Sequence, residues 1–376
     1  MNLLYGVVGE GMGHATRSRV VLDHLARAGH DIKVVVSGRA HGFLVKAFAD
    51  VPNVDIQEIH GLHFVYEENA VDKSASFWSN LAAAPKGILQ NIDAYTDVVG
   101  SFQARAVISD FESFAWLYGK AHDLPTVSID NMQVINRCTH PDTVTGNGTF
   151  DFQLAKLAVK AKMPGAWHYI VSSFFFPPVR KPRTTLVPPI LRPQILAAKA
   201  EPGEHVLVYQ TASSNTELIP TLQRLGRPFR VYGMGREGTE GNVSLRPFSE
   251  QGFIDDLRTA RAVIAGGGYS LMGEAVHLGV PMLSIPLDSQ YEQVLNALWL
   301  QELGYGATAP ELDEAVILDF LDHADAHRDA LRKGYTPRDN AMLFGCVDEV
   351  LADIEGGRRK EQLDTPAMGG WTGEDG

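Results

Sequence analysis

Short runs of β-branched and other apolar residues alternate with helical periodicity along most of the chain. In the first half, these runs predict strands at Leu3–Val8, Ile32–Val36, Ala106–Ser109, Thr126–Ile129 and Tyr169–Ser172. In the second half, they predict strands at His205–Tyr209, Phe229–Tyr232, Ala262–Ala265 and Met282–Ile285. Apolar residues at helical spacing predict a first helix from about His14 to Ala28. Because strands and helices alternate, we expect an α/β fold with two Rossmann-like halves joined by a linker.

A proline-rich and basic segment marks the boundary between the two series of strands. Prolines cannot continue a helix or lie in a central strand. Residues 177–193 are therefore expected to link an N-terminal domain, 1–176, to a C-terminal domain, 194–339. Apolar positions after Asn340 predict a last helix over 340–355, and 356–376 has no apolar period and is expected to be disordered.

Composition narrows the class of protein. The chain has 376 residues, 45% of them hydrophobic, and a net charge of -12, which fits two globular domains and argues against binding nucleic acid. Cys138 and Cys346 are far apart and form no metal-binding pattern, so we expect neither a disulfide framework nor a structural metal. The N-terminus has no basic flank and is too short in apolar residues for a signal peptide or membrane span, so a cytoplasmic location is expected.

The first predicted strand leads into a glycine loop that ends in a histidine. Gly9, Gly11 and Gly13 precede His14 and the first helix. Such a loop allows close approach of a ligand and leaves the helix N-terminus open to an anion. A dinucleotide site would have a small residue in place of His14 and an acid after the second strand, where Val36 is followed by Ser37 and Gly38. An NAD-dependent oxidoreductase is therefore disfavoured.

Two titratable residues are expected at the carboxyl edge of the first sheet. His14 can accept a proton near neutral pH, and Asp110, after another strand, can orient its imidazole. The alternatives are that His14 caps its helix and that Asp110 is the N-cap of the helix that follows.

The segment from Ala262 to Ala297 is the most informative. Gly266, Gly267 and Gly268 lead into a helix that carries Ser270 and Glu274, and Glu292 and Gln293 follow the next strand. Backbone amides and the Ser270 hydroxyl at the helix N-terminus can bind a diphosphate. Glu274, one turn further on, can bind a ribose diol, and Glu292 and Gln293 can bind sugar hydroxyls. Diphosphate, ribose and sugar contacts in this order along the chain predict a nucleotide-sugar site. The alternative is a glycine turn with a solvent-facing Glu274.

These residues resemble the donor-binding signature of UDP-sugar glycosyltransferases with the GT-B fold. The residues in register with the signature are Gly268, Glu274, Ala275, Gly279, Pro281, Pro286, Glu292, Gln293, Asn296 and Ala297. The chain is also similar to the peptidoglycan-precursor N-acetylglucosaminyltransferases near Phe253–Leu257. The pattern from Gly9 to His14 and Arg17 is similar to an uncharacterised bacterial and archaeal branch of these enzymes.

The resemblance implies two Rossmann-like domains that face each other across a cleft, with the donor site on the C-terminal domain and the acceptor site on the N-terminal domain. It also implies a final helix from about Asn340 that crosses back. It implies inverting, metal-independent transfer of a glucose-type or N-acetylglucosamine-type hexose from a UDP-sugar, with His14 as the base and no further cofactor. Some family members have a histidine that contacts phosphate where this chain has Gly266. Ser270 and Thr211 are therefore expected to contribute to phosphate binding.

Several alternatives stay open at this point. The same architecture serves UDP-N-acetylglucosamine 2-epimerases, which need no acceptor, and a nucleotide-sugar-binding protein without turnover is also compatible. The acceptor, a small molecule, a glycan or a lipid carrier, is not specified. Apolar stretches at His60–Tyr66 and Ser76–Leu89 can line an acceptor site or make peripheral contact with a membrane, and core packing explains them equally well.

Overall fold

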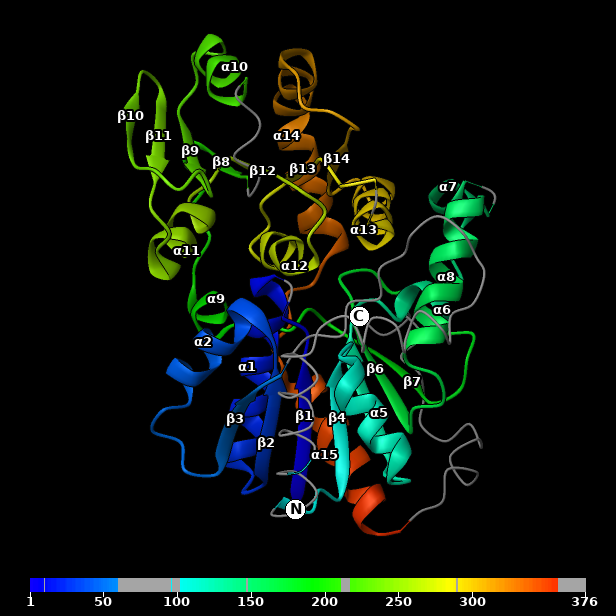
Figure 1. Ribbon diagram of the computed structural model, residues 1–376. Coiled ribbons are helices and arrows are strands. Elements are labelled where there is room, and N and C mark those ends of the chain that lie inside the picture. Colours follow the sequence, from blue (N-terminus) through cyan, green and yellow to red (C-terminus); the bar gives the residue numbers. More distant parts are fainter. Residues whose placement is uncertain are drawn as a thin grey trace, which may run out of the picture.

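The first of two parallel-dominated sheets is formed by the N-terminal half of the chain (Figure 1). The computed structural model describes residues 1–9, 11–59, 96, 102–146, 148–210, 217–288 and 290–357. The strand order is β3-β2-β1-β4-β5-β6-β7, and all of these strands are parallel. The strands are β1 (Asn2–Val7), β2 (Asp31–Val36), β3 (Val54–Glu58), β4 (Ala106–Asp110), β5 (Thr126–Asp130), β6 (His168–Ser172) and β7 (Thr184–Val187).

The second sheet follows the same plan, with the order β10-β11-β9-β8-β12-β13-β14. Its strands are β8 (Val206–Tyr209), β9 (Phe229–Tyr232), β10 (Gly238–Glu240), β11 (Val243–Arg246), β12 (Ala262–Ala265), β13 (Met282–Ser284) and β14 (Gly306–Thr308). Only the β10–β11 pair is antiparallel among these strands. In each sheet the strand order reverses at the first strand, β1 or β8, and open α/β sheets bind ligands outside the carboxyl ends of strands at such a point.

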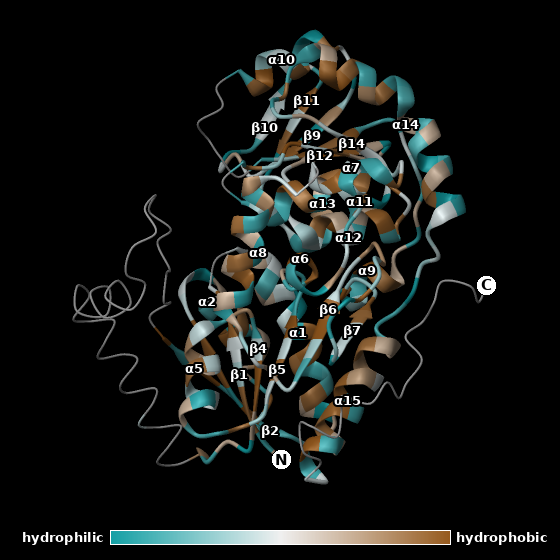
Figure 2. Ribbon diagram, turned by 90° about the vertical axis from the view of Figure 1, so that its right-hand side faces the viewer, coloured by the Kyte–Doolittle hydropathy of each residue, from teal (hydrophilic) through white to brown (hydrophobic). Residues whose placement is uncertain are grey.

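Helices cover the sheets and bury their apolar strands, which are brown in Figure 2. Around the first sheet are α1 (Met12–Arg27), α2 (Gly38–Ala47), α5 (Ser113–Ala121), α6 (Val134–Arg137), α7 (Asp142–Thr145) and α8 (Phe150–Lys162). The second half contains α9 (Pro193–Ala197), α10 (Leu218–Arg224), α11 (Glu250–Arg258), α12 (Tyr269–His277), α13 (Tyr291–Glu302) and α14 (Glu314–Gly334). The α/β architecture and all the strands predicted above are confirmed. The strands β3, β7, β10, β11 and β14 were not expected from the sequence.

The segment expected to be a linker, 177–193, is only partly one. Residues Thr184–Val187 form β7, an edge strand that pairs with β6. Those four residues contain no proline, and an edge strand tolerates the prolines on either side. The connection between the sheets therefore runs from Pro188 to β8 and includes the short helix α9.

The last described helix, α15 (Ala341–Glu355), returns to the first half of the molecule. Leu343, Val347 and Leu351 belong to the apolar core of the first sheet, and the helix contacts β6 and β7. Most of the expected disordered tail, 358–376, lies outside the described residues.

Direct contacts join the two halves. The hydroxyls of Ser172 and Tyr269 are 2.8 Å apart, and Trp299 donates a hydrogen bond to Nδ1 of His140 over 3.0 Å. One buried apolar cluster contains residues from both sheets. None of the helices in the described part of the chain is long and apolar enough to cross a bilayer.

Candidate active site

His14 and Asp110 meet at the carboxyl edge of the first sheet. His14 lies in the first turn of α1, and Asp110 is the last residue of β4, next to the end of β1. Nδ1 of His14 is 3.0 Å from Oδ1 of Asp110. The His14 side chain is 19% exposed and that of Asp110 is 1% exposed, so a ligand can reach the imidazole but not the carboxylate. Asp110 does not cap the next helix, because Glu112 accepts the hydrogen bonds from the amides of Phe114 and Ala115.

Arg17 and Ser18, one turn further along α1, complete the surroundings of Asp110. Arg17 donates to both carboxylate oxygens, over 2.9 Å from Nε and 2.5 Å from Nη2, and the Ser18 hydroxyl donates over 3.0 Å. Burial opposes ionisation of Asp110, but the charges of Arg17 and His14 outweigh it and hold the pKa of Asp110 below its ordinary value. Asp110 is therefore a fixed negative charge beneath the imidazole.

The Nδ1 atom of His14 has two neighbours that require different tautomers. It can donate to Asp110, or it can accept from Nη2 of Arg17, 2.7 Å away. Because Arg17 is already bound to both oxygens of Asp110, the carboxylate can accept a hydrogen bond from a protonated Nδ1 without leaving the guanidinium unpaired. In that tautomer Nε2 carries a lone pair and can act as a base.

A second buried acid, Asp130, ends the neighbouring strand β5. Its carboxylate accepts from the Ser128 hydroxyl over 2.5 Å and from the Gln133 amide over 2.8 Å. Burial raises the pKa of Asp130 to about 6, although these hydrogen bonds act in the opposite direction. The sequence reasoning missed Asp130 and Ser18. An acid at the end of β5, matching Asp110 at the end of β4, was the available signal for Asp130.

The N-terminal glycine loop packs against protein at two of its three glycines. A Cβ at Gly9 would lie 2.2 Å from the carbonyl oxygen of Ser37, and a Cβ at Gly13 would lie 2.7 Å from Oγ of Ser270. Gly11 has a φ of 84° and has nothing within 4 Å of the position of a Cβ. The close approach of Gly13 to Ser270 brings the glycine loops of the two halves together.

The second glycine loop joins β12 to α12 and is held by α13. Oε1 of Gln293 accepts from the amides of Gly267 and Leu287, both over 3.2 Å. A Cβ at Gly267 would lie 2.5 Å from Cβ of Gln293, whereas Gly268 has no atom within 4 Å of that position. A Cβ at Gly266 would meet only more distant atoms, the nearest being Oε1 of Gln293 at 3.5 Å. Gln293 thus positions the loop, and Gly268 is the glycine of the loop that has free space beside its Cα.

The N-terminus of α12 has no side-chain cap. Its first amides and the Ser270 hydroxyl, in the first turn, are the groups that the sequence assigned to a diphosphate. Thr211, the other residue assigned to phosphate, lies outside the described residues.

Glu274 is buried and paired with an arginine from the connection between the sheets. Its two carboxylate oxygens accept from Nε and Nη2 of Arg192, over 2.8 and 2.7 Å, and Nη1 of Arg192 donates to Glu250 over 3.0 Å. Glu274 is therefore not solvent-facing. Its expected contact with a ribose stays a prediction, and it requires Arg192 to share or release the carboxylate. Sequence reasoning missed Arg192, because no local pattern pairs the two residues.

Glu292, at the start of α13, faces the first half of the molecule. Burial raises its pKa, and the nearby positive charges of Arg17 and His14 oppose that shift. The structure thus brings His14, Asp110, Arg17, Ser270 and Glu292 to one region between the sheets. Within the described ranges, no group of three or more His, Cys, Asp or Glu side chains is arranged to hold a metal ion.

Comparisons with known proteins identify the family and the fold of the chain. The sequence model described as Glycosyl transferase family 1 matches residues 1–324. An uncharacterised glycosyltransferase from Methanosarcina acetivorans is 25% identical over 382 residues, covering 89% of this chain and 93% of the relative. One from Methanosarcina mazei is 24% identical over 377 residues, with the same coverage of 89% and 93%.

Solved structures show the same fold at low sequence identity. The calicheamicin glycosyltransferase CalG4 aligns with a TM-score of 0.61 and 16% identity, over 94% of this chain and 98% of its own. A UDP-glucosyltransferase from Polygonum tinctorium aligns with a TM-score of 0.64 and 15% identity, over 94% and 98%. The fold is that of GT-B glycosyltransferases, and the match to the family sequence model covers most of the chain. The chain belongs to glycosyl transferase family 1 and is a glycosyltransferase.

Proposed function

We propose that this enzyme transfers a hexose from a UDP-sugar to an acceptor hydroxyl, with inversion at the anomeric carbon and without a metal or other cofactor. The observation that carries the proposal is the His14–Asp110 pair, 3.0 Å apart, beside the glycine loop and uncapped helix of the second half. The names of structural neighbours, which include a UDP-glucosyltransferase, support a UDP-linked glucose-type donor. The resemblance near Phe253–Leu257 keeps N-acetylglucosamine as the second candidate sugar.

The chemistry follows from the positions of these groups. Nε2 of His14 takes the proton of the acceptor hydroxyl, while Asp110 stabilises the imidazolium that forms. The acceptor oxygen bonds to the anomeric carbon from the side opposite the diphosphate, and the bond from that carbon to the UDP oxygen breaks. Amides at the start of α12 and the Ser270 hydroxyl hold the charge that develops on the leaving diphosphate.

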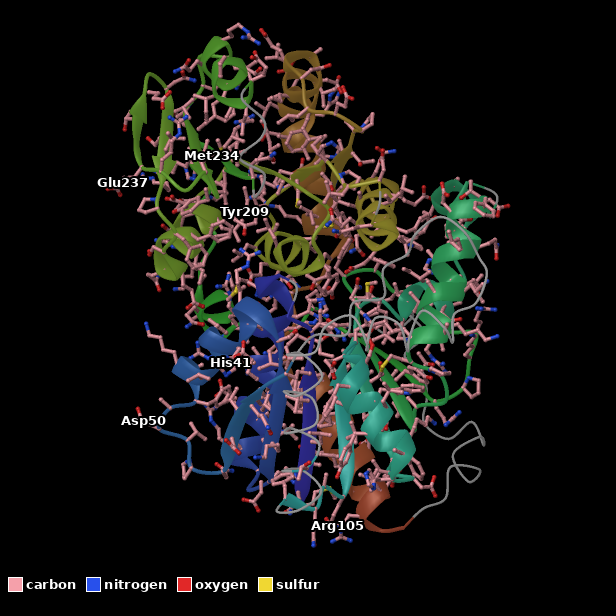
Figure 3. All side chains as sticks on the ribbon, viewed as in Figure 1. His41, Asp50, Arg105, Tyr209, Met234 and Glu237 are labelled. Atoms are coloured by element: carbon pink, nitrogen blue, oxygen red, sulfur yellow. The ribbon has the colours of Figure 1, made fainter. Side chains whose placement is uncertain are left out.

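The test is turnover with UDP-glucose and UDP-N-acetylglucosamine, each incubated with phenolic, glycan and lipid-linked acceptors in the presence of a chelator. We expect release of UDP that depends on the acceptor, with the product linkage opposite in configuration to the donor. The His14→Ala variant should lower kcat by about 10²- to 10⁴-fold, because it removes the general base. The control is His41→Ala on α2, a partly exposed histidine whose Nδ1 lies 4.0 Å from Oε2 of Glu58 and which is not one of the site residues (labelled in Figure 3).

Other outcomes identify the alternatives. Epimerised sugar from donor alone would indicate a 2-epimerase, and intact donor that binds but is never consumed would indicate a binding protein. Full activity in His14→Ala would remove the base assignment while leaving the donor assignment in place. Tight binding of NADH with no binding of UDP would overturn the proposal.

A further inference from the structure

Helix α8 has apolar residues on two opposite faces. Phe152 and Val159 point into the core and are 7% and 4% exposed. Phe150, Leu154 and Leu157, spaced by one helical turn each, are 79%, 48% and 52% exposed. These three residues, the outer face of α8, form an apolar stripe on the surface, and they belong to none of the apolar clusters formed by the described residues.

Positive charge lies along one side of this stripe. Lys156 and Lys160 lie one helical turn apart on α8, and Lys160 is exposed. Arg180 and Lys181 are fixed nearby because both donate to Asn136, over 2.9 Å to its carbonyl and 2.5 Å to its side chain. Burial and the charges of Arg180, Arg137, Lys160 and Lys156 lower the pKa of Lys181 to about 8, so these cations crowd one another.

The position of α8 agrees with an interaction surface. Figure 1 shows α8 at the outer side of the first half, at the level of α13. On its other side the helix reaches across to the second half, where the rings of Phe152 and Tyr291 are 5.8 Å apart. A partner on the outer face would therefore lie beside the region where the two halves meet.

We propose that the outer face of α8 docks on an anionic lipid surface, with Phe150, Leu154 and Leu157 entering the interface and Lys156, Lys160 and Arg180 facing the headgroups. An apolar helix face flanked by lysines is the composition of helices that lie in a membrane interface. The positive charge beside the stripe favours an anionic lipid surface over a second copy of the chain. A two-fold interface at this stripe would bring the same cations close together, whereas anionic headgroups would neutralise them. The proposal does not depend on which sugar or acceptor the enzyme uses.

The test is co-sedimentation of the full chain with vesicles of phosphatidylcholine alone and of equal parts phosphatidylcholine and phosphatidylglycerol. We expect binding to the mixed vesicles, with much weaker binding to phosphatidylcholine and a decrease as salt is added. The triple variant Phe150→Ser, Leu154→Ser, Leu157→Ser should weaken binding by about tenfold or more, because it removes the apolar contact. Lys160→Glu should weaken binding to the mixed vesicles only.

The matched control is Phe248→Ser, since Phe248 is 74% exposed but lies in the second half, away from α8. This variant should bind as the original chain does, and circular dichroism should show that all variants are folded. Failure of the original chain to bind the mixed vesicles, or equal binding by the triple variant, would overturn the proposal. A dimer in light scattering that the triple variant converts to a monomer, without vesicle binding by either, would assign the face to a second copy instead.

Discussion

Asp110 shows what can be predicted for a single residue and what cannot. Its place at the carboxyl end of a parallel strand follows from the pattern of apolar residues, and that place puts it on the same edge as His14. Its other partners, Arg17 and Ser18, depend on the rotation of α1 about its axis, which strand and helix patterns do not specify. The hydrogen bonds made by Glu112 likewise became visible only in the structure.

The charge of Asp110 should matter more than its shape. We expect Asp110→Asn to lower kcat by about 10²- to 10⁴-fold, because an amide does not stabilise the imidazolium of His14. The affinity for UDP, measured by calorimetry, should change little, since Asp110 is buried in the other half of the molecule. The rates should be compared at a temperature at which circular dichroism shows both proteins folded. Unchanged kcat in the variant would contradict the role assigned to the pair.

Asp130 should make the free energy of unfolding fall as pH rises, whereas most carboxylates have the opposite effect. Its folded pKa of about 6 lies above the ordinary value of 3.8, so the folded chain binds the proton more tightly than the unfolded chain. The free energy of unfolding therefore loses roughly 3 kcal/mol as pH rises from about 4 to about 7, from this residue alone. The measurement is urea unfolding of the original chain and Asp130→Asn across that range. The difference between the two proteins should change with pH in this direction, and a constant difference would be evidence against a raised pKa.

At the scale of elements, the sequence predicted the two glycine loops, but it did not predict which of their glycines pack against protein and which do not. The run from Gly266 to Gly268 looked uniform, yet Gly267 packs on α13 and Gly268 is open. The difference arises because Gln293 and Asn296, more than 25 residues later, approach Gly267 and not Gly268. The strands β10, β11 and β14 were missed because their sequences, GTE, VSLR and GAT, contain no continuous apolar run of the kind that predicted β8 and β12.

Alanine at the two neighbouring glycines should separate packing from binding. Gly267→Ala places a Cβ 2.5 Å from Gln293, so the loop must move away from α13 and the melting temperature should fall. Gly268→Ala meets no atom within 4 Å, and the φ of -64° is ordinary, so the melting temperature should stay the same. If a diphosphate approaches this loop closely, Gly268→Ala should still weaken UDP binding, as calorimetry would show. Unchanged UDP affinity in Gly268→Ala would place the diphosphate elsewhere.

At the scale of the whole molecule, contacts between the halves come from positions far apart in the sequence. Trp299 donates to His140, and its ring stacks on Phe175 with centroids 4.7 Å apart and planes 11° apart. Local patterns predicted two series of strands and a last helix, and the family resemblance implied that this helix crosses back. It did not predict the aromatic contacts, because pairing across more than a hundred residues is set by how the finished domains fit together.

Trp299→Phe should loosen this contact between the halves without removing it. The phenyl ring can keep the stack on Phe175, but the hydrogen bond to His140 is lost, which costs about 1 kcal/mol. Hydrogen exchange should become faster in α6, α8 and α13 together. The control is Trp116→Phe, because Trp116 donates to Pro164 within the first half and its loss should leave α13 unchanged. Faster exchange in α13 with both variants would mean that the effect is not specific to the contact between the halves.

The return of α15 to the first sheet has a consequence for how the chain folds during synthesis. The strands of that sheet are complete once Val187 has left the ribosome, but the apolar residues that α15 covers stay uncovered until residues 341–355 emerge. The whole second sheet is translated in the interval, so it can fold first even though it comes second in the sequence. The nascent N-terminal half therefore carries an uncovered apolar surface for most of synthesis, and a chain stopped before Ala341 would keep this surface exposed.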